Sequence, residues 1–132
     1  MPTVLDASAI LAFLLDEEGA DRVEEHLDRA TGSATPGLVC IVNLTEVLEV
    51  LPDALTSPLF GPSGLVEVVG ITQAQAQWAA SIKEKTRVAG LSLADRLCLA
   101  VAHDTNQSVL TADRAWSEVA LGVSIVQIRG RV

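Results

Sequence analysis

The chain has 132 residues, with 17 Asp plus Glu against 9 Lys plus Arg, so its formal net charge is −8. Because 49% of the residues are hydrophobic and only 20% are charged, an intrinsically disordered chain is excluded. The length fits one domain that needs no disulfide or structural zinc, and the acidity argues against a protein that holds long nucleic acid by charge alone.

Cysteine usage and the apolar pattern indicate the compartment. Cys40 and Cys98 lie in apolar surroundings without a C-x-x-C motif, so we expect two buried thiols in a reducing environment. No apolar run approaches the roughly 18 residues of a membrane span. The N-terminal Met1-Pro2-Thr3 lacks the basic start of a signal peptide. These features predict a soluble, cytoplasmic protein with no membrane partner.

The N-terminal half of the chain predicts two strands and three helices. The first strand ends at Asp6, and the hydroxyl of Ser8 would cap the helix that follows. A charged helix and a Gly/Ser/Pro loop come next, and then a second strand leads into a helix with Asn43 as its cap. In chain order, these predicted elements span 3–5, 9–15, 20–30, 31–36 (the loop), 38–41 and 43–51.

The C-terminal half begins with a Pro- and Gly-rich segment over 52–64, where we expect irregular structure around a short helix. Thr72 starts a helix rich in Ala and Gln, Ser92 starts another, and a short helix is expected near Trp116. In chain order, the remaining predicted elements are a strand over 65–69, helices over 72–85 and 93–103, a strand over 108–111, the short helix and a strand over 123–128.

Strands that alternate with helices predict right-handed crossovers and a mostly parallel sheet covered on both faces. The predicted strands are apolar nearly throughout, as burial on both faces requires. Because the chain contains no repeat, linker or low-complexity tract, we expect one α/β domain over 1–132.

Four acidic residues would meet at one edge of this sheet. Asp6 and Asp113 follow predicted strands, and Glu46 and Asp95 lie near the starts of predicted helices. In open α/β sheets, ligands bind beyond the carboxyl ends of the strands. We therefore expect the four carboxylates to share one site at that edge.

Each of these acids also has a structural explanation that the sequence leaves open. Asp6 and Asp113 would serve equally as caps of the helices that follow them. Asp95 would complete an S-x-x-D capping box with Ser92. Glu46 has a helix position that suits a solvated face as well as a site.

Four clustered carboxylates cannot all remain ionised without cations. Oxygen-only ligands suit Mg²⁺ or Mn²⁺ rather than zinc, and such a site activates water and stabilises the leaving oxygen of a phosphodiester. Short polar residues within three positions of the acids are candidates for orienting the ligands, or else ordinary caps and turns: Ser8, Asn43, Thr45 and Thr111.

Basic residues are sparse, and each allows two interpretations. Arg96 and Arg114 each follow a candidate site acid, and a basic group precedes Gly90: Lys83, Lys85 and Arg87. They are either helix-end and surface charges or phosphate contacts that frame the acidic site. Histidine-based zinc motifs, P-loops, dinucleotide fingerprints and nucleophile elbows are missing from the sequence.

Four segments of the chain resemble, in order, the four acidic motifs of PIN-domain proteins. They span 4–11, 42–47, 91–100 and 110–116, and the closing strand over 123–129 also fits. The similarity covers nearly the whole chain at the size of the VapC-like toxins. Any one motif is weakly specific, but four in the right order are strong. The segment over 52–64 departs most from the family pattern.

The resemblance implies a PIN-like (Rossmann-like) three-layer sandwich with a mostly parallel sheet of about five strands. It implies a Mg²⁺- or Mn²⁺-dependent endoribonuclease, with two metals when RNA is bound, that acts as the toxin of a toxin–antitoxin pair. By the same resemblance, Asp6, Glu46, Asp95 and Asp113 bind metal with support from Ser8 and Thr111. A homodimer and an antitoxin partner are expected, because family members often dimerise and are silenced by a small antitoxin.

Two other classes are weighed against this interpretation. A PIN-like binding module that has lost catalysis is the first, although all four acids are present. A receiver-type signalling domain is the second, since it is also a small acidic α/β fold. A receiver domain has paired acids after its first strand and a lysine near its last strand. Here Asp6 is followed by Ala7, and the last predicted strand has no lysine.

Overall fold

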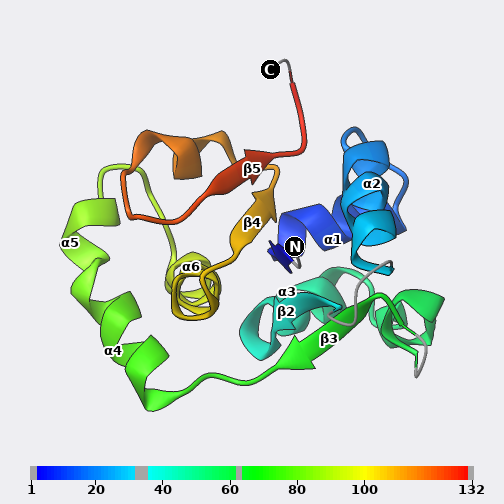
Figure 1. The fold of residues 1–132 in the computed structure, drawn as a ribbon, viewed down its shortest axis with the longest axis horizontal. Coiled ribbons are helices and arrows are strands. Elements are labelled where there is room, and N and C mark those ends of the chain that lie inside the picture. Colours follow the sequence, from blue (N-terminus) through cyan, green and yellow to red (C-terminus); the bar gives the residue numbers. More distant parts are fainter. Residues whose placement is uncertain (1–2, 32–35, 62–63, 131–132) are drawn as a thin grey trace.

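The sheet consists of parallel strands in the spatial order β3-β2-β1-β4-β5, which confirms the predicted sheet (Figure 1). The computed structural model describes residues 3–31, 36–61 and 64–130. The strands within these residues are β1 Thr3–Leu5, β2 Gly37–Cys40, β3 Val66–Val69, β4 Ser108–Thr111 and β5 Ile125–Gln127. The predicted loop over 31–36 lies mostly outside the described residues, as do 62–63 of the Pro/Gly-rich segment.

The central strand β1 pairs with β2 on one side and with β4 on the other. Val4 is in register with Leu38 and with Val109, and Leu5 is in register with Leu110. Because β1 and β4 are parallel and Leu5 is in register with Leu110, Asp6, which follows β1, lies beside Thr111, the last residue of β4, at the carboxyl edge.

Helices cover both faces of the sheet, as predicted (Figure 1). The described α-helices are α1 Ala7–Leu14, α2 Ala20–Thr31, α3 Ile41–Val50, α4 Gln73–Ser81, α5 Lys83–Thr86 and α6 Leu93–Thr105. Three short 3₁₀-helices complete the elements: η1 Ala54–Thr56, η2 Pro58–Phe60 and η3 Arg114–Glu118. The η1 and η2 helices confirm short helical structure inside the segment 52–64, and η3 confirms the short helix near Trp116.

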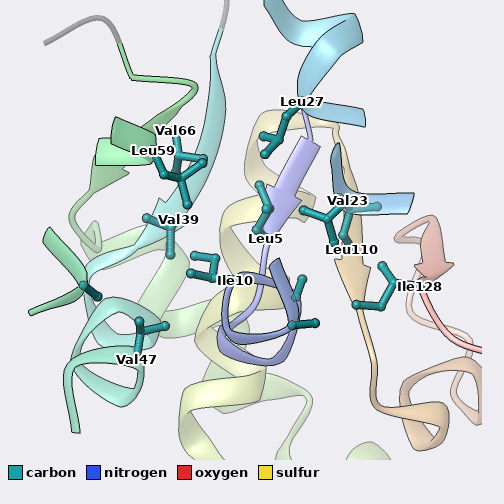
Figure 2. Close-up of a cluster of buried hydrophobic side chains, with 13 residues drawn as sticks. Leu5, Ile10, Val23, Leu27, Val39, Val47, Leu59, Val66, Leu110 and Ile128 are labelled. Atoms are coloured by element: carbon teal, nitrogen blue, oxygen red, sulfur yellow. The ribbon is translucent and has the colours of Figure 1, made fainter. Parts of the chain in front are cut away.

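Alternation along the strands separates two apolar cores. On one face, Leu5 and Leu110 belong to a cluster with side chains of α1, α2 and α3, among them Ile10, Val23 and Val47 (Figure 2). On the other face, the cluster joins strand residues to α6 and η3, and its members include Val4, Val109, Leu99, Val101 and Trp116. A sheet that is apolar on both faces can bury its strands only in this way.

Two predicted helix caps are wrong. Helix α1 begins at Ala7, and its cap is Asp6 rather than Ser8, because the Asp6 carboxylate accepts the N–H of Ala9 at 2.8 Å. Helix α3 begins at Ile41, which was expected to end the strand, and Cys40 precedes it with no side-chain cap. Asn43 therefore lies inside the first turn of α3 instead of capping it.

The predicted helix over 72–85 is divided into two. Thr72 caps α4 through a complete capping box with Gln75, but Ile82 (φ −95°, ψ 7°) interrupts the helix before α5. The hydroxyl of Thr86 donates to the carbonyl oxygen of Ile82 at 2.8 Å and closes the short α5. By contrast, Ser92 caps α6 as expected, in a complete capping box with Asp95.

The two cysteines are free and buried, as predicted for Cys40 and Cys98. Among the described residues, no helix has the length and apolar character needed to cross a bilayer.

We predict that Leu110→Ala lowers the free energy of unfolding by about 2–5 kcal/mol, because Leu110 is fully buried and truncation leaves a cavity between β4 and the helices. Urea unfolding followed by circular dichroism measures this loss. The matched control is Leu55→Ala, at a leucine that is 51% exposed, which should change the free energy by less than about 0.5 kcal/mol. Equal effects of the two variants would contradict the assigned core.

Candidate active site

Asp6 is the most enclosed of the predicted site acids, at 5% exposure. Its Oδ1 accepts hydrogen bonds from the Ser8 hydroxyl at 2.7 Å and from the N–H of Ala9 at 2.8 Å. Its Oδ2 accepts one from the Thr111 hydroxyl at 2.6 Å. The carboxylate thus joins the end of β1, the start of α1 and the end of β4.

The two hydroxyls around Asp6 are themselves held by the backbone. The N–H of Ala112 donates to Ser8 Oγ at 2.9 Å, and the N–H of Asp113 donates to Thr111 Oγ1 at 3.0 Å. Each hydroxyl proton is therefore directed at the Asp6 carboxylate. Ser8 and Thr111 lie beside Asp6, where the sequence predicted them, and their role in supporting metal-binding acids stays a prediction.

Burial raises the pKa of Asp6 from 3.8 to about 6. Desolvation of the carboxylate is the largest cause, and the hydrogen bonds from Thr111, Ser8 and Ala9 lower the pKa only in part. The charge of Asp95 raises it further. Asp6 therefore lies in surroundings that would favour a nearby cation.

Glu46 is half-buried on α3 and is positioned by Asn43. The Asn43 side chain is completely buried, and its Nδ2 donates to Glu46 Oε1 at 3.0 Å and to the carbonyl oxygen of Ala94 at 3.3 Å. Asn43 thereby connects Glu46 to the first turn of α6, next to Asp95. Its Oδ1 is buried without a hydrogen-bond partner among the described residues.

Asp95 completes the capping box of α6, and Asp113 caps η3. Asp95 Oδ2 accepts the N–H of Ser92 at 2.9 Å, and Asp113 Oδ1 accepts the N–H of Ala115 at 3.0 Å. The pKa of Asp95 is raised, chiefly by desolvation and also by the negative charge of Asp113. The electrostatic effect of Asp113 on Asp95 indicates that the two carboxylates lie near one another.

A cleft of about 400 Å³ brings all four predicted acids together at the carboxyl edge. Among the described residues, its lining consists of Asp6, Ala7, Ser8, Leu11, Glu46, Glu49, Val50, Asp95 and Asp113. The lining holds five carboxylates and neither lysine nor arginine. Glu49 was not identified as a site residue from the sequence. Its position three residues after Glu46 on the same helix could have indicated that it shares the face of Glu46. Thr45, which was a candidate for orienting the ligands, is exposed, and its hydroxyl donates to the carbonyl oxygen of Ile41 on the same helix.

The donor set of the cleft fits a hard divalent cation, because every candidate ligand is an oxygen and the cleft lining offers no positive charge. The side chains are not drawn together around one point: among the described residues, no three His, Cys, Asp or Glu side chains form a group that could hold a metal ion. A bound cation would therefore have to draw the carboxylates closer together.

The two arginines considered for phosphate contact point elsewhere. Arg96 is buried, and its Nη1 donates to the carbonyl oxygen of Ala79 at 2.9 Å, which gives it a structural role between α6 and α4. Arg114 is exposed, and its Nη1 donates to the carbonyl oxygen of Arg129 at 3.2 Å. Arg96 is thus held by the protein itself, whereas Arg114 is exposed beside Asp113; contact of either arginine with substrate stays a prediction.

Fold and site together define an α/β protein with an acidic cleft at the carboxyl edge of a parallel sheet. The model of the PIN domain family matches residues 3–121, and the chain belongs to that family. No match was found among curated protein sequences.

Solved structures with the same fold cover nearly the whole chain. A toxin–antitoxin complex from Klebsiella pneumoniae is 14% identical with a TM-score of 0.69, covering 98% of this chain and 99% of that one. VapBC2 from Rickettsia felis, bound to a promoter DNA fragment, is 13% identical with a TM-score of 0.73, covering 96% and 98%. The sarcin-ricin loop cleaving toxin VapC20 from Mycobacterium tuberculosis is 16% identical with a TM-score of 0.59, covering 92% and 98%.

We predict that the protein loses stability as the pH rises from about 4 to about 6, through the titration of Asp6. The folded state holds the Asp6 proton more tightly than the unfolded chain does. The pKa difference between 3.8 and about 6 therefore corresponds to about 3 kcal/mol of folding stability. This stability is fully present below about pH 4 and is lost above about pH 6. Urea unfolding in EDTA across this range measures the effect. Asp6→Asn should flatten the profile.

The control for this prediction is Asp53→Asn at an exposed aspartate, which should keep the profile of the parent protein. A profile that is equally steep in the parent and in Asp6→Asn would show that burial of Asp6 has no such effect.

Proposed function

We propose that this protein is a Mg²⁺- or Mn²⁺-dependent endoribonuclease and the toxin of a toxin–antitoxin pair, formed by one domain over 1–132. The observation that carries the proposal is the cleft in which Asp6, Glu46, Asp95 and Asp113 meet without a cationic side chain. Membership in the PIN domain family supports it. The similar fold of VapC20, a toxin that cleaves the sarcin-ricin loop, supports RNA as the substrate.

In this proposal the four carboxylates hold the metal, as one ion or as two when RNA is bound. The bound metal would neutralise the carboxylates, lower the pKa of a water molecule and stabilise the leaving oxygen of the phosphodiester. The chain itself keeps the ligands oriented. Ser8 and Thr111 direct their protons at Asp6, and Asn43 holds Glu46 beside the first turn of α6.

The proposed partners are RNA, a cognate antitoxin and a second copy of the chain, in the cytoplasm. Two of the similar structures are toxin–antitoxin complexes, which supports an antitoxin for this protein as well. The cleft also has apolar walls, since Leu11 and Val50 line it beside the acids. A peptide that places a cation among the acids and apolar residues against these walls would complement the cleft and block it.

The receiver-type alternative disagrees with the strand order. Flavodoxin-like receivers have the order 2-1-3-4-5, whereas this sheet has the order 3-2-1-4-5. A PIN-like module without catalysis has no specific observation in its favour, and the activity measurement below separates it from the proposed nuclease.

We predict that the purified protein cleaves RNA in the presence of Mg²⁺ or Mn²⁺ and that EDTA abolishes cleavage. Asp6→Asn should reduce the rate by at least about 10²-fold, by analogy with other positioned electrostatic groups. Fragments resolved on denaturing gels measure the rate, and their sequences identify the cleavage site. Cleavage without a divalent metal, or full activity of Asp6→Asn, would exclude the mechanism, and RNA binding without any cleavage would favour the inactive module.

We also predict that Mg²⁺ or Mn²⁺ raises the thermal unfolding midpoint at pH 7, because a ligand that binds only the folded state stabilises it. Glu46→Gln should reduce the rise by weakening metal affinity. The matched control is Glu24→Gln at an exposed glutamate of α2, which should leave the rise unchanged. If Glu46→Gln keeps the full rise, Glu46 is a solvated residue without a role in metal binding.

A further inference from the structure

Among the described residues, the largest group of free positive charges lies on and just after α5. Lys83, Lys85 and Arg87 are all exposed, and we call them the α5 cations. Arg87 forms an ion pair with Glu84 at 3.6 Å, but both side chains are about three-quarters exposed (74% and 77%), so solvent screens this pair and leaves it weak. The α5 cations therefore remain accessible to a ligand.

The other cations with described side chains are engaged by the protein itself. Arg22, Arg96, Arg114 and Arg129 each donate to a backbone carbonyl oxygen, at distances between 2.7 and 3.2 Å. The side chains of Arg29 and Arg131 lie outside the described part of the chain. Among the described basic residues, the α5 cations are thus the ones without a bond to the backbone.

Contacts between α4 and α6 show where the α5 cations lie. Gln75 bonds Asp104 at 3.0 Å, the rings of Trp78 and His103 stack with centroids 4.4 Å apart, and Arg96 bonds Ala79. Residue numbers rise along α4 as they fall along α6, so the two helices are antiparallel. The last turn of α4 therefore lies beside the first turn of α6, which carries Asp95.

Helix α5 continues from that end of α4 and is attached to the start of α6. The N–H of Leu91 donates to the carbonyl oxygen of Thr86 at 3.3 Å, just before Ser92 caps α6. The connection places α5 at the end of α6 that borders the acidic cleft. Figure 1 shows the same path, with the chain turning from α5 back to α6.

We propose that the α5 cations bind the phosphate backbone of the RNA whose scissile bond enters the acidic cleft. This inference rests on the proposed ribonuclease function and adds the surface that holds the substrate. A chain with a net charge of −8 and a cleft lined by carboxylates repels RNA. Cations at the end of α6 that carries Asp95 would offset this repulsion and supply affinity that the cleft itself lacks.

The chemistry of lysine defines what this surface would recognise. A lysine ammonium is a flexible point charge that contacts phosphate without reading bases. The α5 cations should therefore bind single-stranded RNA of any sequence with strong salt dependence. Selection of a particular RNA would then come from its shape or from residues closer to the cleft.

The test compares Lys83→Gln/Lys85→Gln with the parent, both in an Asp6→Asn background that prevents cleavage. Binding of a fluorescent single-stranded RNA is followed by anisotropy at several salt concentrations. We expect affinity at low salt to fall by at least about tenfold. On single strands each phosphate contact contributes about 0.7 to the slope of log K against log salt. Removing two lysine contacts should therefore make this slope shallower by about 1.4.

The matched control is Gln73→Glu/Gln77→Glu in the same background. It makes the net charge more negative by the same amount, but at exposed positions on α4 that precede its last turn. This control should retain most of the affinity and the full slope. Circular dichroism of each variant confirms that the fold is intact.

The outcomes separate this inference from the proposed function. With Asp6 restored, the lysine variant should cleave with a raised KM and an almost unchanged kcat, and this result supports the inference. If the parent cleaves RNA and the lysine variant binds and cleaves equally well, the inference fails while the nuclease assignment stands. If the parent neither binds nor cleaves RNA, both fail. An equal loss in the control variant would attribute the effect to net charge and overturn the inference.

Discussion

The buried carboxylate of Asp6 is the interaction on which the rest of the site depends. It accepts hydrogen bonds from Ser8, Ala9 and Thr111, so one side chain ends β1, starts α1 and fastens α1 to β4. Burial at 5% exposure is unfavourable for an ion, and the raised pKa of about 6 expresses that cost. The protein therefore keeps at the centre of its carboxyl edge a group that becomes more stable when a cation approaches.

Charge segregation follows from the same arrangement. Carboxylates gather in the cleft, while Arg22 holds α2 to the end of β5 through Gln127, and Arg129 holds the residues after β5 to Glu18, just before α2. The excess of acids that makes the chain acidic is thus partly a property of the cleft. An acidic protein can bind RNA if free cations lie on the same side as that cleft, and the α5 cations adjoin the end of α6 that carries Asp95.

The sequence predicted the sheet and the meeting of the acids better than it predicted the helix starts. The apolar strands, together with the rule that ligands bind beyond the carboxyl ends of parallel strands, were sufficient to predict that Asp6 and Asp113 share one site. The choice of Asp6 over Ser8 as the cap depends on Thr111, which is 105 positions away, and the inward position of Asn43 depends on Ala94, 51 positions away. Neither proline nor glycine marks the break at Ile82, so local sequence contained no signal for it.

The acids can be helix caps and metal ligands at the same time, because a carboxylate has two oxygens. Asp95 accepts the Ser92 N–H with Oδ2, Asp113 accepts the Ala115 N–H with Oδ1, and Glu46 accepts from Asn43 with Oε1. For Asp113 and Glu46 the second oxygen has no hydrogen bond within the described residues. The bonds of these three acids restrict the side chains at little further entropic cost, because the folded backbone and Asn43 already hold the donors. A divalent ion would then meet ligands that are partly oriented before it binds.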